Sequence, residues 1–173
     1  MACSRRSSTA VVVPPQEVDL AADTAIAILT DSVADVALPP PQKPRVIFSM
    51  QRGGCYGRCP EYRFEIYSDG MAYYTGAAHV TRLGEWQLES SEPVYERIRS
   101  RLQLADFYTL SNQYPEGGMQ IESLPVTTIY SYHDGRAKTV VNWYDAPPRL
   151  IELQRELERL IDGQLWTPIV PKS

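Results

Sequence analysis

The sequence has few of the residues that usually carry chemistry, with two histidines and three cysteines among 173 residues. Neither His79 nor His133 stands in a recognisable hydrolase motif, and the carboxylates are scattered along the chain. A general base paired with a nucleophile is therefore not indicated. We expect no catalytic residues and no cofactor, and we favour a protein that is not an enzyme.

An excess of positive charge and a long apolar run are also missing. The 17 basic and 21 acidic residues give a net charge of −4, which argues against a broad surface for nucleic-acid phosphates. No apolar run approaches the roughly 18 residues of a membrane span. The remaining composition, 43% hydrophobic and 22% charged, predicts one globular domain with a substantial core and a tail.

The N-terminal segment differs in composition from the rest of the chain, because it is rich in proline and alanine and poor in aromatic residues. We predict a flexible or partly helical tether over 1–44, with a weak amphipathic helix over 18–36 left open. A run of prolines over 39–44 is typical of a stiff spacer and marks the boundary. The domain is expected over 45–166, followed by a C-terminal tail over 167–173.

The third cysteine, Cys3, stands apart from the other two. Ala2-Cys3 followed by a polar tether resembles the end of a bacterial lipoprotein signal, so we predict lipidation at Cys3. The apolar segment of such a signal is missing before Cys3, which leaves an incidental cysteine of a cytoplasmic protein as the alternative. The favoured location is the periplasmic side of the cell envelope, with contact to the membrane through a lipid anchor alone.

Apolar and polar residues alternate from Arg45 onward, and this period predicts strands. Six segments fit, over 45–51, 61–68, 71–75, 84–90, 126–132 and 137–144. Asp69-Gly70 and Asp134-Gly135 predict tight hairpin turns, because both residue types tolerate positive φ.

Two segments have helical spacing instead, over 94–105 and 148–161. Ser91 is expected to cap the first helix, and 106–124 is expected to be irregular. The order ββββαββα predicts an α+β fold. We expect an antiparallel sheet of about six strands with both helices packed on one face, preceded by the proline-rich tether.

Cysteine, glycine and proline are concentrated in Gly53-Gly54-Cys55-Tyr56-Gly57-Arg58-Cys59-Pro60-Glu61-Tyr62. Glycine permits close backbone approach and Pro60 fixes its own φ, so a tight loop is predicted before the second strand. We favour a structural disulfide between Cys55 and Cys59, which needs Cα atoms about 4.4–6.8 Å apart.

Two alternatives for these thiols stay open. One is a redox dithiol activated by Arg52 and Arg58, although the spacing is not Cys-x-x-Cys. The other is a soft-metal site, because Cys-x-x-x-Cys-Pro resembles the copper-binding segment of Sco-type chaperones. In that case His79 is the candidate third ligand beside Cys55 and Cys59; otherwise no metal is expected.

A longer pattern carries a resemblance to a known family. It consists of Cys55-x-Gly57-x-Cys59-Pro60-x-Tyr62, then Asp69-Gly70, Tyr74 and Gly76. This pattern resembles the bacterial family called domain of unknown function 6438, over about residues 45–163. Members of that family often follow a lipoprotein signal, and the resemblance implies no activity.

Eleven tyrosines and three tryptophans favour a binding surface, since exposed aromatic residues are enriched in protein interfaces. We expect this surface to use Tyr56, Arg58, Tyr62, Tyr67 and Tyr73. The expected partner is a protein or another envelope component. The sequence thus predicts an envelope-associated, non-enzymatic binding or structural domain with a stapled loop; the alternative is a thiol redox or copper-binding protein.

Overall fold

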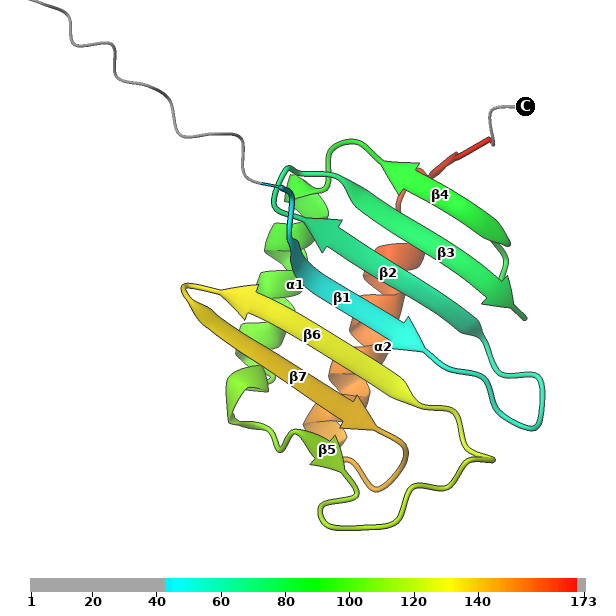
Figure 1. Ribbon diagram of the computed structural model, residues 1–173. Helices are drawn as coiled ribbons and strands as arrows, with labels where there is room; N and C mark the ends of the chain where they lie inside the picture. The colour runs from blue at the N-terminus through cyan, green and yellow to red at the C-terminus, as the bar shows by residue number, and fades with distance from the viewer. Residues whose placement is uncertain (1–42, 171–173) are drawn as a thin grey trace, which may run out of the picture. The chain divides into compact units, whose positions relative to one another are not determined.

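The computed structural model describes residues 43–170 (Figure 1). The predicted lipidation site at Cys3 and the predicted helix over 18–36 lie outside these residues. The elements in chain order are β1 (Val46–Arg52), β2 (Glu61–Tyr67), β3 (Ala72–Ala78), β4 (Gly84–Leu88), α1 (Glu92–Leu104), η1 (Phe107–Thr109), β5 (Gln113–Tyr114), β6 (Thr127–His133), β7 (Arg136–Asn142), α2 (Pro148–Asp162) and β8 (Thr167–Pro168).

The strands form one sheet in the order β5-β7-β6-β1-β2-β3-β4-β8, and both helices cover the same face of it (Figure 1). Every neighbouring pair is antiparallel except β5 and β7. The predicted α+β class is therefore confirmed. The two predicted hairpins join β2 to β3 and β6 to β7, with Gly70 at φ 85° and Gly135 at φ 76°.

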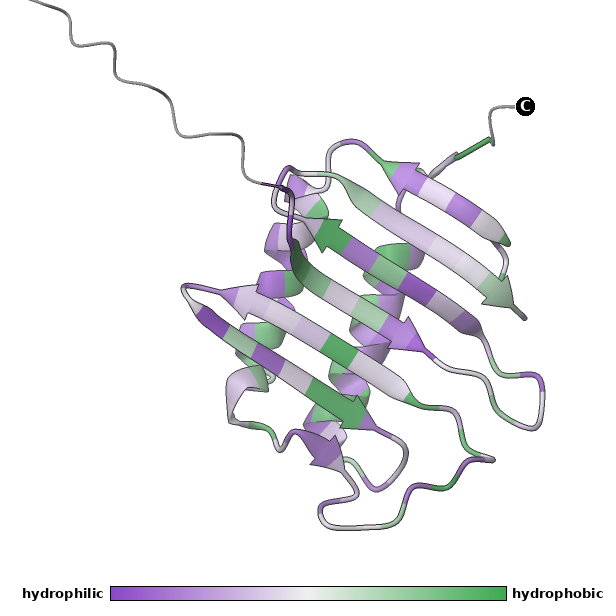
Figure 2. Ribbon diagram, in the orientation of Figure 1, coloured by the Kyte–Doolittle hydropathy of each residue, from purple (hydrophilic) through white to green (hydrophobic). Residues whose placement is uncertain are grey.

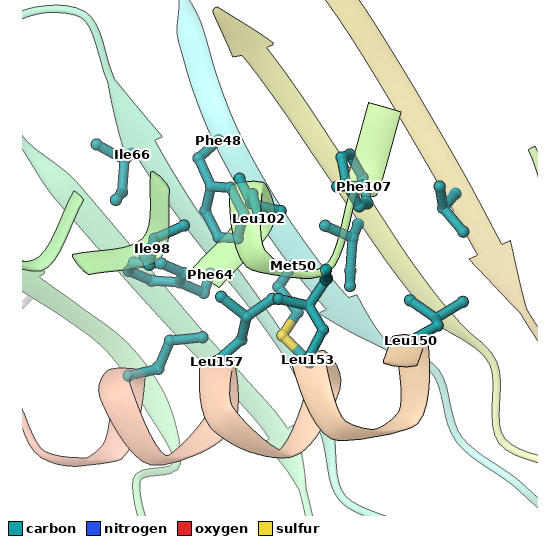
Figure 3. Close-up of a cluster of buried hydrophobic side chains, with 14 of the residues drawn as sticks. Phe48, Met50, Phe64, Ile66, Ile98, Leu102, Phe107, Leu150, Leu153 and Leu157 are labelled. Carbon is teal, nitrogen blue, oxygen red and sulfur yellow. The ribbon is translucent and has the colours of Figure 1, made fainter. Parts of the chain in front are cut away.

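The core lies between the sheet and the two helices, as the alternation of the strands predicts. Phe48 and Met50 on β1 and Phe64 and Ile66 on β2 point toward α1 and α2 (Figure 3) and are at most 1% exposed. The residues between them on β1 and β2 face away from the helices, which gives the strands their banded hydropathy (Figure 2). Leu150, Leu153, Leu157 and Ile161 form the buried stripe of α2.

The sheet has eight strands, where the sequence predicts about six. The segment 106–124, expected to be irregular, contributes η1 and β5, and buries Phe107, Leu110 and Tyr114. Thr167 and Pro168, which the sequence analysis places in the C-terminal tail, form β8 against β4. Both added strands have two residues, which is too short for alternation to be recognised.

Ser91 precedes α1 as predicted, but its side chain does not cap the helix. Its hydroxyl instead donates to the carbonyl oxygen of Gly70 at 2.9 Å. Ser91 is only 1% exposed, so the bond satisfies a buried hydroxyl and ties the start of α1 to the β2–β3 turn. The cap prediction was wrong because Ser91 has helical backbone dihedrals, φ −87° and ψ −8°, and not the extended conformation from which a side chain caps a helix.

Candidate functional site

The cysteine loop connects the end of β1 to the start of β2 at one end of the sheet. The sulfur atoms of Cys55 and Cys59 lie at disulfide-bonding distance, with their Cα atoms 5.7 Å apart, inside the range that a disulfide requires. The Gly53 amide donates to the Val126 carbonyl oxygen at 2.8 Å, which fixes the first residue of the loop against the segment before β6. The loop is thus closed on itself by the two cysteines and hydrogen-bonded to the segment before β6.

We expect the Cys55→Ala/Cys59→Ala protein to fold and to lose at most about 2 kcal/mol of unfolding free energy. The crosslink closes a ring with a sequence separation of only 4, so it removes little entropy from the unfolded chain. Urea denaturation of oxidised wild type and of the double variant measures the difference. Wild type with reduced cysteines should match the variant, and a global loss of structure in either would contradict a local role for the staple.

Next to the loop, Arg52, Tyr62 and Glu158 form a polar cluster between the sheet and α2. Arg52 Nη1 lies 2.5 Å from Glu158 Oε1, and the Tyr62 hydroxyl donates to the same oxygen at 3.4 Å. The Arg52 and Glu158 side chains are 22% and 30% exposed, so water screens the pair only partly. Arg52 Nε is buried and has no hydrogen-bond partner in the described part of the chain. Burial and, secondarily, the Glu158 carboxylate raise the pKa of Tyr62 above that of a free tyrosine.

This cluster predicts a loss of stability at alkaline pH. Tyr62 binds its proton more tightly in the folded than in the unfolded protein, and burial also raises the pKa of Tyr74 to about 12. Above the unfolded tyrosine pKa of about 10 the unfolded state therefore loses protons first, so stability falls as pH rises. Urea denaturation at several pH values between 8 and 11 should show a shallower decline for Tyr62→Phe than for wild type. The matched variant Tyr56→Phe, at a side chain that is 83% exposed, should keep the wild-type decline of unfolding free energy with pH. An equal decline in both variants would show that Tyr62 is not the group responsible.

Two cavities flank the Arg52–Glu158 pair, and both residues line each of them. The first, about 210 Å³, lies between α2 and the loop after β3 and is also lined by Pro60, Tyr62, Tyr74 and His79. The second, about 240 Å³, lies between α2 and the adjoining ends of β6 and β7, where Thr127, Asn142, Trp143 and Gln154 line it. We call the two cavities and the ion pair between them the α2 groove. The α2 groove is lined mainly by polar residues and lies at the end of the sheet that carries the cysteine loop.

The structure does not bring the five residues of the predicted binding surface together. Tyr62 is 8% exposed and lies on the helix-covered face, in the α2 groove. Tyr67 and Tyr73 lie on the opposite face of the sheet, where their rings pack edge to face at 5.6 Å. Tyr56 and Arg58 are exposed in the cysteine loop. Alternation along β2 explains the separation, because Tyr62 and Tyr67 are an odd number of residues apart.

The histidines lie in different places. His79 is exposed, has a φ of 53° and lines the first cavity of the α2 groove. His133 ends β6, and its Nε2 lies 2.8 Å from Arg99 Nη2 on α1. Both residues line a separate cavity of about 440 Å³. Within residues 43–170, no group of three or more histidine, cysteine, aspartate or glutamate side chains is arranged to hold a metal ion.

Asn142, Gln154 and Glu158 were missed by sequence reasoning. Gln154 does carry a signal, because it falls on the apolar stripe of α2 next to Leu153 and one turn before Leu157. A glutamine there must bury its amide, and it is 7% exposed. Asn142 likewise follows the buried Val140 at strand spacing, so its side chain faces the helices. Polar residues at core positions were therefore the available clue.

The fold and site define a small α+β domain, with one helix-covered sheet face and a cysteine-stapled loop beside a polar groove. The chain belongs to the family described as Domain of unknown function (DUF6438), which it matches over residues 46–161. The match spans β1 through nearly all of α2 and includes the cysteine loop. A comparison with curated proteins gave no match. None of the helices among residues 43–170 has both the length and the apolar character needed to cross a membrane.

Proposed function

We propose that this protein is a non-enzymatic binding module of the cell envelope, in which the disulfide-stapled loop supports the α2 groove as the binding site. Its partner is a protein or another envelope component, and Cys3 is its lipid anchor. The observation that carries the proposal is the half-buried Arg52–Glu158 pair with a cavity on each side. An ion pair placed among cavities supports recognition better than stability, because desolvation offsets much of its attraction.

In this proposal the cysteines stabilise the loop beside the groove and do not take part in a reaction. Cys55 and Cys59 are at bonding distance, and disulfides form and persist in oxidising compartments. A thiol site needs a free thiolate, which a disulfide does not offer until it is reduced. The loop joins the end of β1 at Arg52 to the start of β2 at Glu61, so closing the loop constrains the strand ends on which Arg52 and Tyr62 are paired.

Small probes of different charge test the proposal. Acetamide, acetate, methylammonium and glycerol are titrated separately into the oxidised protein, and backbone amide shifts are followed by NMR. We expect at least one probe to shift the resonances of residues that line the α2 groove. The Arg52→Met/Glu158→Met protein, with both charges replaced, should lose that response. Glu96→Gln, at the separate cavity beside His133, is the matched control and should keep it.

Two results would overturn the proposal. One is the failure of all four probes to shift groove residues while the protein remains folded. The other is chemistry at the cysteines, seen as stoichiometric copper after purification or as repeated reduction of a disulfide substrate. The latter result would support the thiol redox or copper-binding alternative.

A further inference from the structure

We propose that the cavity between α1 and the β6–β7 hairpin binds a phosphate group, either as the free ion or as a monoester. This cavity is separate from the α2 groove, so the inference goes beyond the proposed function and does not depend on it. It measures about 440 Å³ and is larger than either cavity of the α2 groove. It lies where the sheet-facing side of α1 passes the end of the hairpin and η1 (Figure 1).

Three side chains that donate hydrogen bonds reach this cavity from different elements. They are Arg99 on α1, His133 at the end of β6 and Arg136 at the start of β7. His133 and Arg136 are directly paired across the hairpin, so their side chains lie on the same face of the sheet. A guanidinium group matches two oxygens of a phosphate at once, which makes arginine a preferred residue for phosphate recognition.

These donors are accessible to a ligand in the cavity. The side chains of Arg99 and His133 are 37% and 35% exposed, and Arg136 is an exposed residue. Within residues 43–170, Arg136 has no carboxylate at ion-pair distance. Its guanidinium carbon lies over the Tyr108 ring, 5.0 Å from the ring centroid. The ring holds this positive charge beside the cavity without neutralising it.

His133 Nε2 has two neighbours that make opposite demands on it. It lies 2.8 Å from Arg99 Nη2 and 3.1 Å from Asp134 Oδ2. An arginine N–H only donates, so Nε2 must be unprotonated to accept from Arg99, whereas a bond to the Asp134 carboxylate requires a hydrogen on Nε2. One nitrogen cannot meet both demands. The protein groups alone therefore leave one of the two contacts unsatisfied.

A phosphate group beside Arg99 removes this conflict. Its oxygens accept the hydrogen of Arg99 Nη2, and His133 is then free to carry a hydrogen on Nε2. That hydrogen is donated to Asp134 or to the phosphate itself. Arg136, opposite His133 on the hairpin, supplies a second guanidinium for the remaining oxygens.

Two carboxylates line the same cavity and oppose an anion. Glu96 is 52% exposed and lies 2.7 Å from Arg99 Nη1, so it already has a cationic partner. Asp134 is 83% exposed at the hairpin turn. Water therefore screens these carboxylates more than it screens Arg99 and His133. The more sheltered groups of the cavity are those that donate to an oxyanion.

Four probes test the inference by NMR. Inorganic phosphate, glucose 1-phosphate, glucose and acetate are titrated separately into the oxidised full-length protein at constant pH and ionic strength. We expect both phosphate probes to shift the amides of residues that line the cavity. Both should bind at least about fivefold more tightly than acetate, because phosphate has more charge and more acceptor oxygens. Glucose alone should give no shift. Tighter binding of glucose 1-phosphate would identify a monoester as the ligand, and tighter binding of inorganic phosphate would identify the free ion; either order supports the inference.

Two arginine variants locate the site. Arg136→Gln removes the unpaired guanidinium and should weaken phosphate binding at least about fivefold. Arg97→Gln is the matched control, because it makes the same change of charge at an exposed residue of α1 that does not line the cavity. This control should keep the affinity of wild type.

The ring nitrogens of the histidines give a second readout. Phosphate should raise the fraction of His133 that carries a hydrogen on Nε2, seen in the ¹⁵N resonances of the imidazole. His79, which lines the α2 groove, serves as the internal reference and should not change.

Three results would overturn the inference. The first is the absence of shifts in the cavity with both phosphate probes while the protein remains folded. The second is equal binding of phosphate and acetate, or of phosphate to Arg136→Gln and Arg97→Gln. The third is phosphate binding without the change at His133 Nε2, which would place the anion elsewhere.

Discussion

Gly76→Ala is expected to destabilise the domain by about 3 kcal/mol or more, through a steric clash with backbone. A Cβ at this position would lie 1.8 Å from the Arg82 carbonyl oxygen and 2.8 Å from Val80 Cγ2. The loop after β3 folds back across Gly76, so a backbone atom and not a flexible side chain would have to move. This contact gives a physical reason for a glycine at position 76.

Thermal unfolding followed by circular dichroism measures the effect, and we expect the melting temperature to fall by about 10 °C or more. Gly57→Ala is the matched control, because its Cβ would meet only Cys55 Sγ at an ordinary 3.6 Å. That variant should melt within a few degrees of wild type. A Gly76→Ala protein as stable as Gly57→Ala would show that the loop after β3 does not pack on β3.

Phe64→Ala is expected to be at least as damaging, with a loss of about 3–5 kcal/mol. Phe64 is fully buried on β2 among the residues of the core (Figure 3). Its ring centroid lies 5.9 Å from that of Phe48 and 5.8 Å from that of Trp166. Truncation removes a large apolar side chain and leaves a cavity that β2, paired on both sides, cannot close. Trp166 should lose its packing against the core at the same time.

Urea denaturation gives the loss for Phe64→Ala, and tryptophan fluorescence in a Trp86→Phe/Trp143→Phe background reports on Trp166. Arg63→Ala is the control on the same strand, because its side chain is 56% exposed on the opposite face of the sheet. Its unfolding free energy should stay within about 0.5 kcal/mol of wild type. Equal effects of the two changes would mean that the register of β2 is inverted.

The parts of the fold that the sequence predicts are those with a repeated pattern. Six strands show alternation, two helices show an apolar stripe, and two hairpins contain Asp-Gly, so each is specified by its own residues. The segment 106–124 has no such period, and its buried Phe107 and Tyr114 are placed by tertiary packing. β8 has two residues and exists only because β4 is there to pair with it.

The candidate site was predicted less completely than the fold. The cysteine loop was predicted from its composition, because glycine, proline and two close cysteines constrain the backbone locally. The groove beside it is assembled from β1, β2, β3, β6, β7 and α2, and Arg52 and Glu158 are separated by 106 residues. Periodicity says that Tyr62 is buried and that Gln154 lies on an apolar stripe. It does not say that these residues line neighbouring cavities.

Cys55 and Cys59 are proposed to form a structural disulfide beside the α2 groove and to take no part in thiol chemistry. This proposal is tested by the thiol state of protein exported to the periplasm behind an added signal peptide and alkylated during lysis without reductant. Intact-mass analysis should show no alkyl group on Cys55 or Cys59 before reduction, and two after reduction. Alkylation of both residues before reduction would show free thiols and would contradict the account.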